Sequence, residues 1–157
     1  MISVLINEKR FNYRIAAVIL YEGRVLAHRG EQEDFWSLPG GRCEMMEFSA
    51  NTLKREMMEE IGEELEIGRL LWLVENMHVF NGREVHELCF FYQANLSANS
   101  LLLKEDEFIG YEPDAKLIYQ WHDLAQIQSL DLKPDFLKKG LVNLPQHIEH
   151  ICVTLNA

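Results

Sequence analysis

The chain has 157 residues and a formal net charge of −10, with 25 acidic and 15 basic side chains. A hydrophobic share of 48% excludes a disordered or collagen-like chain, and the length fits one domain over residues 1–157. An acidic surface repels phosphate backbones, so we expect no broad electrostatic binding of nucleic acid.

The cysteines and the start of the chain bear on the cellular compartment. The three cysteines are widely spaced and odd in number, which is typical of unpaired thiols rather than of a disulfide framework. The N-terminus turns polar after six residues, which argues against a signal peptide, and no apolar run approaches the ~20 residues that cross a bilayer. We therefore expect a cytoplasmic protein without a membrane segment.

The first part of the chain is predicted to form a hairpin, a loop and a helix. The predicted elements are an apolar stretch at 2–6 (an edge strand or a contact with a second copy), strands at 14–20 and 25–28, a polar loop at 30–34, a short extended piece at 35–38, a break at 39–41 and a helix at 48–61. Gly62 stands where a helix stop is expected.

The second part is predicted to be mostly strands, with short helices near the end. The predicted elements are strands at 67–80 and 87–95 joined by a turn at Asn81-Gly82, a loop at 96–114, a strand at 115–122, short helices at 124–129 and 134–143, and a last strand at 148–155. Strands interrupted by a few helices indicate an α+β fold, with a mixed β-sheet covered by helices.

The predicted helix carries an unusual number of acids. Glu56, Glu59, Glu60 and Glu63 fall within roughly one 100° sector of the helix. These side chains repel one another, and the helix dipole disfavours negative charge in the C-terminal half. A solvated acidic face is one explanation. A hard divalent cation, Mg²⁺ or Mn²⁺, is the other, because such ions take carboxylate oxygens and bridge to phosphates.

The acids belong to a longer motif. The fixed positions from Gly41 to Glu63 are Gly41, Glu47, Arg55-Glu56, Glu59-Glu60 and Gly62, and their spacing resembles the Nudix box. The chain is similar to Nudix hydrolases on these residues. The last box position is usually aliphatic and is Glu63 in this sequence.

This resemblance implies an α/β/α sandwich and a metal-dependent hydrolase, a Nudix pyrophosphohydrolase. By position in the motif, Glu56, Glu59 and Glu60 would hold Mg²⁺ or Mn²⁺, and the carbonyl of Gly41 would complete a coordination shell. The resemblance gives the other motif residues supporting roles: Glu47 and Arg55 form an ion pair that braces the loop against the helix, and Gly40 permits the tight turn of a metal-binding loop.

The residue that accepts the proton of water is less well defined by the resemblance. Family members use either a box glutamate or an acid beyond the box, and candidates of the second kind are Glu105, Asp106 and Glu107, with Glu107 taken as the candidate catalytic residue. Glu87, beside the predicted turn, is a candidate metal or substrate contact. Arg29, at the end of the second predicted strand, is a candidate phosphate contact.

The activity implied by the resemblance is cleavage of a phosphoanhydride bond in a nucleoside diphosphate linked to another moiety, such as a nucleotide sugar or a nucleoside triphosphate. Two alternatives stay open: a nucleotide-sensing module without turnover, and a hydrolase of RNA 5′ ends or caps. Markers of particular substrates are mostly absent; for example, no proline stands between Pro39 and Pro113. Members of the family often form homodimers.

Overall fold

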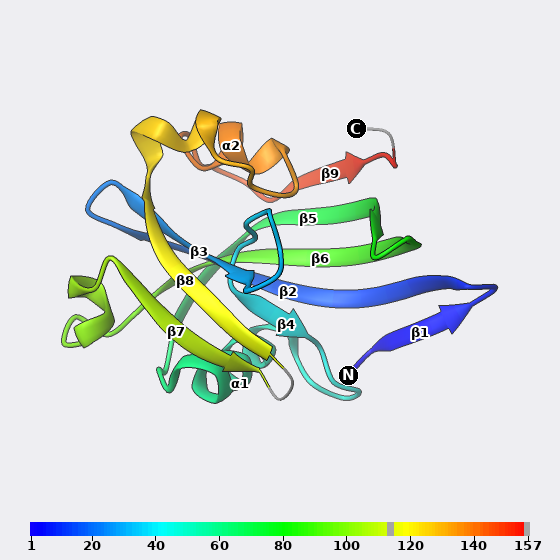
Figure 1. Cartoon of the computed structure of the whole chain (residues 1–157), viewed down its shortest axis with the longest axis horizontal. Coiled ribbons are helices and arrows are strands. Elements are labelled where there is room, and N and C mark those ends of the chain that lie inside the picture. Colours follow the sequence, from blue (N-terminus) through cyan, green and yellow to red (C-terminus); the bar gives the residue numbers. More distant parts are fainter. Residues whose placement is uncertain (113–114, 156–157) are drawn as a thin grey trace.

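The computed structural model describes residues 1–112 and 115–155 and consists mainly of strands (Figure 1). Its strands are β1 (Ser3–Ile6), β2 (Lys9–Tyr21), β3 (Arg24–Gly30), β4 (Gly40–Arg42), β5 (Glu66–Phe80), β6 (Arg83–Asn95), β7 (Glu107–Glu112), β8 (Ala115–Asp123) and β9 (Glu149–Val153). The helices are α1 (Ser49–Ile61), α2 (Phe136–Gly140) and two 3₁₀ segments, η1 (Leu101–Lys104) and η2 (Leu124–Ser129).

The strands form a mixed sheet in the order β7-β8-β3-β2-β6-β5-β9, and β1 and β4 also pair with β2. The pairs β2–β6 and β5–β9 are parallel, whereas the other pairs are antiparallel. β2 and β3 pair only near their shared turn, so β3, β8 and β7 diverge from the rest of the sheet.

Helices cover both faces of the sheet, as the predicted α/β/α sandwich requires. α1 and α2 lie on opposite sides of the strands in Figure 1. Leu53 and Met57 of α1 are fully buried in one apolar cluster, and Leu137 and Leu141, in and just after α2, are buried in another. Alternate residues of β2 supply both clusters: Ile15, Ala17 and Ile19 face α1, and Ala16 and Val18 face α2.

Most predicted elements are present, often with longer bounds. The strand predicted at 14–20 is the central part of β2, the stretch at 2–6 forms the edge strand β1, and the last strand is shorter than the predicted 148–155. The turn predicted at Asn81-Gly82 has positive φ at both residues (51° and 74°), as a tight hairpin turn requires. The second short helix was predicted at 134–143, and α2 covers only 136–140.

The prediction of a loop over 96–114 was wrong for most of its length. This segment contains η1 and the edge strand β7, while residues 113 and 114 lie outside the described residues. β7 contains Phe108, Ile109 and Tyr111, which favour a strand, but Gly110 and the flanking acids interrupt this pattern, and this interruption accounts for the predicted loop. Its antiparallel pairing with β8 supplies the hydrogen bonds that the local sequence does not predict. Among the described residues, no helix is long and apolar enough to span a membrane.

Candidate functional site

The helix α1 is fixed in place by its packing and by its C-terminal cap. Leu53 and Met57 bury one side of the helix. Gly62 takes a left-handed conformation (φ 70°), its N–H donates to the Met58 carbonyl at 3.1 Å, and the Glu63 N–H donates to the Met57 carbonyl at 3.4 Å. Glu63 accepts a 2.7 Å hydrogen bond from the Ser100 hydroxyl, so its carboxylate has a partner where an aliphatic residue is usual.

Two glycines let the loop before α1 approach its neighbours closely. Gly40 and Gly41 pair with Ala16 and Ile15 of β2. A Cβ at Gly40 would collide with the Ile15 carbonyl oxygen, and a Cβ at Gly41 would collide with the carboxyl group of Glu56. The Glu56 carboxyl group therefore occupies the place that a side chain at position 41 would take.

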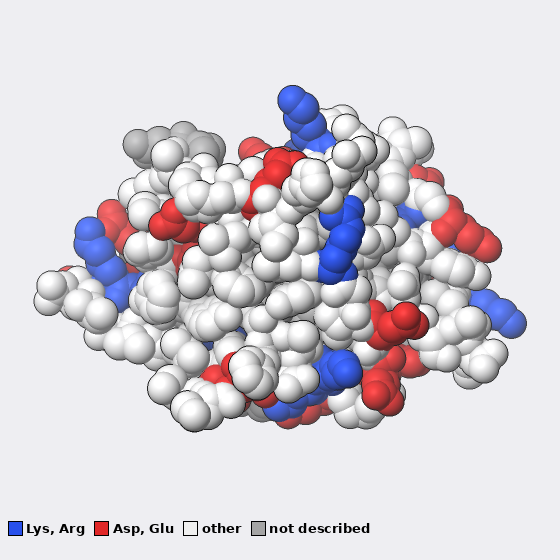
Figure 2. Space-filling view, turned by 180° about the vertical axis from the view of Figure 1, so that it is seen from behind, with Lys and Arg blue, Asp and Glu red and all other residues white. Residues whose placement is uncertain are grey.

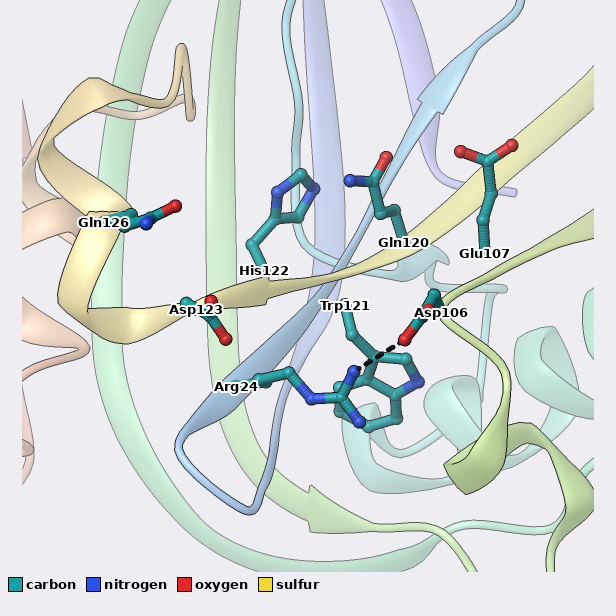
Figure 3. Close-up of a pocket in the computed structure, with 8 residues that line it drawn as sticks. All are labelled: Arg24, Asp106, Glu107, Gln120, Trp121, His122, Asp123 and Gln126. Carbon is teal, nitrogen blue, oxygen red and sulfur yellow. Dashed lines mark hydrogen bonds and ion pairs between the residues drawn. The ribbon is translucent and has the colours of Figure 1, made fainter.

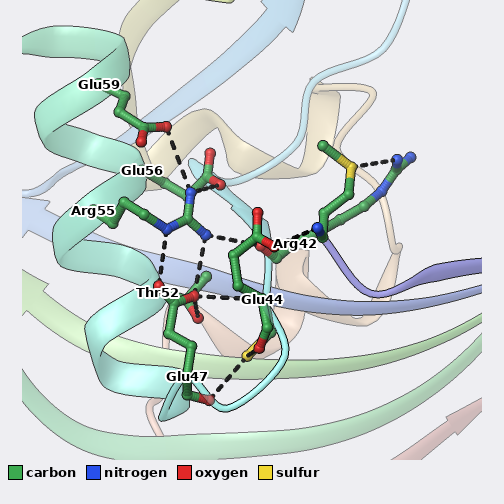
Figure 4. A network of polar contacts seen from close by, with 9 residues as sticks. Arg42, Glu44, Glu47, Thr52, Arg55, Glu56 and Glu59 are labelled. Atoms are coloured by element: carbon green, nitrogen blue, oxygen red, sulfur yellow. Dashed lines mark hydrogen bonds and ion pairs between the residues drawn. The ribbon is translucent and has the colours of Figure 1, made fainter.

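Arg55 connects the loop to the acids of α1 (Figure 4). Its guanidinium donates to the Glu47 carboxylate at 2.8 and 3.1 Å and to the Arg42 carbonyl at 3.1 Å. It also donates to Glu56 at 2.6 Å and lies 3.5 Å from Glu59. A rigid guanidinium with five donors can hold two carboxylates and a carbonyl in a fixed arrangement, which a lysine cannot do.

Glu47 is an acceptor for three different groups. Besides Arg55, the Thr52 hydroxyl donates to it at 2.7 Å and the Glu44 N–H at 3.1 Å. The Arg55 hydrogen bonds and these further donors lower the pKa of Glu47 to about 2. Glu47 is therefore a permanent anion at neutral pH, and the loop and the helix are joined by a charged contact that stays intact.

Glu60 is the most buried acid of the helix, with 5% of its surface exposed. The Tyr119 hydroxyl of β8 donates to it at 2.6 Å. Burial raises the pKa of Glu60 well above its ordinary value, and the neighbouring charges of Glu56 and Glu112 raise it further, although the Tyr119 hydrogen bond opposes them. Without a cation, this concentration of acids is electrostatically unfavourable.

Glu112 of β7 belongs with the acids of α1. Burial raises the pKa of the Glu112 carboxyl, and the charge of Glu56 raises it further. Glu112 is at the end of β7, and Gly110 on the same side of this strand packs against the Glu60 carbonyl of α1. We call Glu56, Glu59, Glu60 and Glu112 the carboxylate cluster.

Three arginines lie next to the carboxylate cluster, although the protein is acidic overall. Arg14 of β2 faces Arg42 of β4 in the strand register, and Arg10 is on the same side of β2 as Arg14. Burial lowers the pKa of the Arg42 guanidinium, and the charges of Arg10 and Arg14 lower it further. Within residues 1–112 and 115–155, none of these three guanidinium groups is within ion-pair distance of a carboxylate. We call Arg10, Arg14 and Arg42 the arginine cluster.

Glu87 and Arg29 have different surroundings. Glu87 of β6 accepts from the Asn12 amide at 3.5 Å and lies close enough to Arg42 to affect its pKa, so it belongs to the arginine side of the site. Arg29 donates to the Glu33 carbonyl at 3.1 Å and stacks over the Trp36 ring at 5.3 Å. The Arg29 guanidinium is therefore held by residues of the loop that follows β3.

Glu107 is not brought to the carboxylate cluster. It lines a shallow pocket of about 370 Å³ at the β7–β8 edge, and Figure 3 shows it on the same side as Gln120 and His122, opposite Trp121. Trp121 packs in the apolar cluster that contains α1, so Glu107 points away from this helix. Five strand positions, roughly 17 Å, separate it from Glu112.

The residues of the cluster suit a hard divalent cation. The donors are carboxylate oxygens, which Mg²⁺ and Mn²⁺ prefer, and the absence of a side chain at position 41 lets the Glu56 carboxylate lie against the backbone of the loop. A divalent cation also offsets the cost of several acids near the buried Glu60. The donor set therefore fits the expected ion.

On the face that Figure 2 shows, the basic side chains do not form an extended surface for binding anions. On the face that Figure 2 describes, blue and red side chains occur as separate groups among uncharged residues, without a continuous basic stripe. The cationic groups that lie together on one side of β2 and β4 belong to the arginine cluster, which sequence reasoning missed. Their common side of the sheet depends on the pairing of β2 with β4, which joins distant segments.

A family model matches most of this chain, and two curated proteins match a shorter part of it. The family model described as "NUDIX domain" matches residues 11–142. The RNA pyrophosphohydrolase of Campylobacter jejuni subsp. doylei is 35% identical over 68 residues, which cover 39% of this chain and 44% of that protein. The chain matches less than half the length of the curated relatives, 30% of one and 44% of the other.

Solved structures share the fold over most of the chain. The structure of an ADP-ribose pyrophosphatase from Streptococcus suis is 18% identical, with a TM-score of 0.58, and covers 90% of this chain and 98% of that one. The structure of a MutT NUDIX hydrolase from Burkholderia pseudomallei is 25% identical, with a TM-score of 0.53, and covers 73% and 84% of the two chains.

Proposed function

The chain belongs to the NUDIX family, and from this premise we propose that it is a metal-dependent pyrophosphohydrolase of small nucleotides. The bond cleaved would be a phosphoanhydride bond in a nucleoside diphosphate linked to another moiety, such as a sugar or a further phosphate. The observation that carries the proposal is the carboxylate cluster, in which Arg55 holds Glu56 and the Glu56 carboxylate lies against Gly41.

Glu56, Glu59 and Glu60 would hold Mg²⁺ or Mn²⁺, together with the carbonyl of Gly41. When bound, such an ion neutralises the diphosphate and stabilises the charge that develops on the oxygens at phosphorus. Arg55 orients Glu56 through their 2.6 Å contact, and the Tyr119 hydroxyl orients Glu60. Glu47 in turn holds Arg55 in place, so a change at Glu47 acts through the arginine.

Glu112 is the group that we propose to accept a proton from the attacking water. A carboxylate whose pKa is raised is a better base than an ordinary surface glutamate, and burial and the Glu56 charge raise the pKa of Glu112. Its position beside Glu56 supports this role, whereas Glu107 points to the other side of β7. Glu107 therefore has no part in the proposed reaction.

The arginine cluster would bind the phosphate groups of the substrate. Guanidinium groups form paired hydrogen bonds with phosphate oxygens, and those of Arg10, Arg14 and Arg42 are not engaged by carboxylates within the described chain. Arg10 is held by the Ser3 hydroxyl at 2.7 Å, which leaves its remaining donors available. Glu87 lies at the edge of this cluster and would contact a polar group of the substrate.

The test is a hydrolysis screen with purified protein, in which products are identified by mass. The panel holds nucleoside triphosphates, nucleotide sugars, ADP-ribose, dinucleoside polyphosphates and a 5′-triphosphate RNA, each with Mg²⁺, Mn²⁺ or EDTA. We expect metal-dependent turnover of at least one small nucleotide. Glu56→Gln should lower kcat by more than about a hundredfold, because the cation loses an anionic ligand.

The matched control is Glu64→Gln, at an exposed acid just beyond α1. It removes the same charge from the same region and should leave kcat unchanged. Turnover that persists in EDTA, or a loss below tenfold in Glu56→Gln, would contradict the metal assignment.

The RNA alternative is favoured by one observation, the 35% identity to an RNA pyrophosphohydrolase. The net charge of −10 and the separate charged groups in Figure 2 count against long RNA as a substrate. Rates on the RNA that fall steeply with salt would support this alternative, since phosphate contacts release counterions. Nucleotide binding without turnover would support the sensing module. A cytoplasmic location and a homodimer stay predictions.

A further inference from the structure

A second group of metal-ligating side chains lies at the opposite edge of the sheet from the carboxylate cluster. Glu75 of β5 faces Cys152 of β9 directly in the parallel register, and His150 is two residues before Cys152. Residues two apart on a strand share a face, so β9 presents the imidazole and the thiol beside the carboxylate. Glu75 and His150 are about half exposed, and Cys152 is exposed, so ions in solution can reach all three.

The three donor atoms lie at distances close to those of a metal coordination shell. The Cys152 Sγ is 3.5 Å from the Glu75 Oε2 and 3.6 Å from the His150 Nε2. In a tetrahedral zinc site, the usual bond lengths imply separations of about 3.4–3.6 Å between such donors. The His150 Nε2 and the Glu75 Oε2 are 2.7 Å apart, so these two side chains would separate by less than about 1 Å to admit an ion.

The donor types select a different ion from the one that suits the carboxylate cluster. A thiolate, an imidazole and a carboxylate together favour zinc and similar borderline-soft ions over Mg²⁺, which prefers oxygen alone. The two sites are also separate in space. Glu75 lies on β5, and β6 and β2 intervene before β4, which corresponds to roughly 14 Å across the sheet.

We propose that Glu75, His150 and Cys152 form a zinc site, with the fourth coordination position open to solvent. Binding replaces the hydrogen bond between Glu75 and His150 with bonds to the ion, and the Cys152 thiol releases its proton to solvent. Because β9 is an edge strand that pairs only with β5 among the described residues, the ion would cross-link this strand to the sheet. The site is independent of the nucleotide chemistry proposed above.

The test uses Co²⁺ as a spectroscopic probe on the full chain, after removal of metals and reduction of thiols. Excess Mg²⁺ is added first to fill the carboxylate cluster. That cluster contains no sulfur ligand, so it cannot produce a sulfur-to-cobalt band. We expect an absorption band from sulfur-to-cobalt charge transfer that saturates at one ion per chain and disappears when Zn²⁺ is added. Zn²⁺ should also raise the midpoint of thermal unfolding, because it binds the folded chain.

The variants separate this site from the other thiols. Cys152→Ser should abolish the sulfur band, whereas Cys43 and Cys89 are buried and remain in that variant. His150→Gln and Glu75→Gln should weaken Co²⁺ binding by at least about tenfold. Glu149→Gln is the matched control, since this acid neighbours His150 on β9 and points to the other face. A sulfur band that survives in Cys152→Ser, or the absence of a sulfur band in the unmodified protein, would overturn the proposal.

Discussion

Two adjacent glycines in the loop before α1, Gly40 and Gly41, have different roles. Gly40 and Gly41 both lack space for a side chain, but the obstacles differ in kind. At Gly40 the obstacle is the backbone of Ile15 in the central strand, which cannot move. At Gly41 the obstacle is the end of the flexible Glu56 side chain, which can move but only away from its position beside Arg55.

We therefore expect alanine at position 40 to lower stability and alanine at position 41 to lower the catalytic rate. Gly40→Ala should destabilise the fold by about 3 kcal/mol through overpacking, which corresponds to a fall of about 6–12 °C in Tm for a chain of this size. Gly41→Ala should leave Tm nearly unchanged and lower kcat by about a hundredfold, because the Glu56 carboxylate is displaced. Thermal unfolding followed by circular dichroism, together with steady-state kinetics, measures both effects. Equal losses of Tm in the two variants would show that position 41 is structural.

At the scale of elements, the orientation of β7 decides which acid reaches the helix. Glu107 and Glu112 are at opposite ends of this strand and point to opposite faces. Glu112→Gln should lower kcat by about a hundredfold or more with little change in KM, because it removes the proposed proton acceptor and no binding contact. Glu107→Gln should leave both constants unchanged.

Steady-state kinetics of the two variants under saturating Mg²⁺ makes this comparison direct. Tm should be similar in both variants, which excludes unfolding as the cause of a lower rate. If Glu107→Gln is the slower enzyme, the proton acceptor lies on the other face of β7 and the assignment to Glu112 is wrong.

The same element shows what the sequence could and could not predict. Residues of the box lie on one loop and one helix, and the resemblance to Nudix hydrolases implied the ion pair between Glu47 and Arg55 that the structure contains. The position of Glu112 depends on the pairing of the edge strand β7 with β8, whereas the sequence pattern had predicted a loop for this segment. The arginine cluster depends on the register between β2 and β4, which is a long-range property of the sheet.

At the scale of the whole molecule, a buried histidine links folding to pH. His28 of β3 is 6% exposed and packs against the Tyr119 ring at 5.2 Å, and its Nδ1 has no hydrogen-bond partner. Burial lowers the pKa of His28 from about 6.5 to about 3, and the nearby charge of Arg14 contributes to this decrease. The folded protein therefore keeps this imidazole neutral where the unfolded chain protonates it.

The consequence is that the contribution of His28 to stability is lost on acidification. Between pH 6.5 and pH 3 the unfolded state binds one more proton at this residue than the folded state, so this contribution to the free energy of unfolding falls as pH decreases. Glu60 and Glu112, whose pKa values are raised in the folded state, contribute with the opposite sign. At about pH 5 the loss attributable to His28 should be about 2 kcal/mol. Glu47 contributes at lower pH, because its folded pKa of about 2 lies below its ordinary value of 4.5 and its stabilisation is lost as pH falls through that interval.

Urea unfolding at several pH values between about 6.5 and 4.5 isolates the histidine contribution when the unmodified protein is compared with His28→Gln. Glu60 and Glu112, whose raised pKa values give the opposite pH dependence, titrate in both proteins and cancel in the difference. The unmodified protein should lose more unfolding free energy on acidification than His28→Gln does, whatever the effect of the substitution at neutral pH. His147→Gln removes an exposed histidine instead and serves as the matched control. If the slope is the same in His28→Gln as in the unmodified protein, this imidazole is protonated in the folded state, and the charge of Arg14 must then be screened from it by an anion or by water.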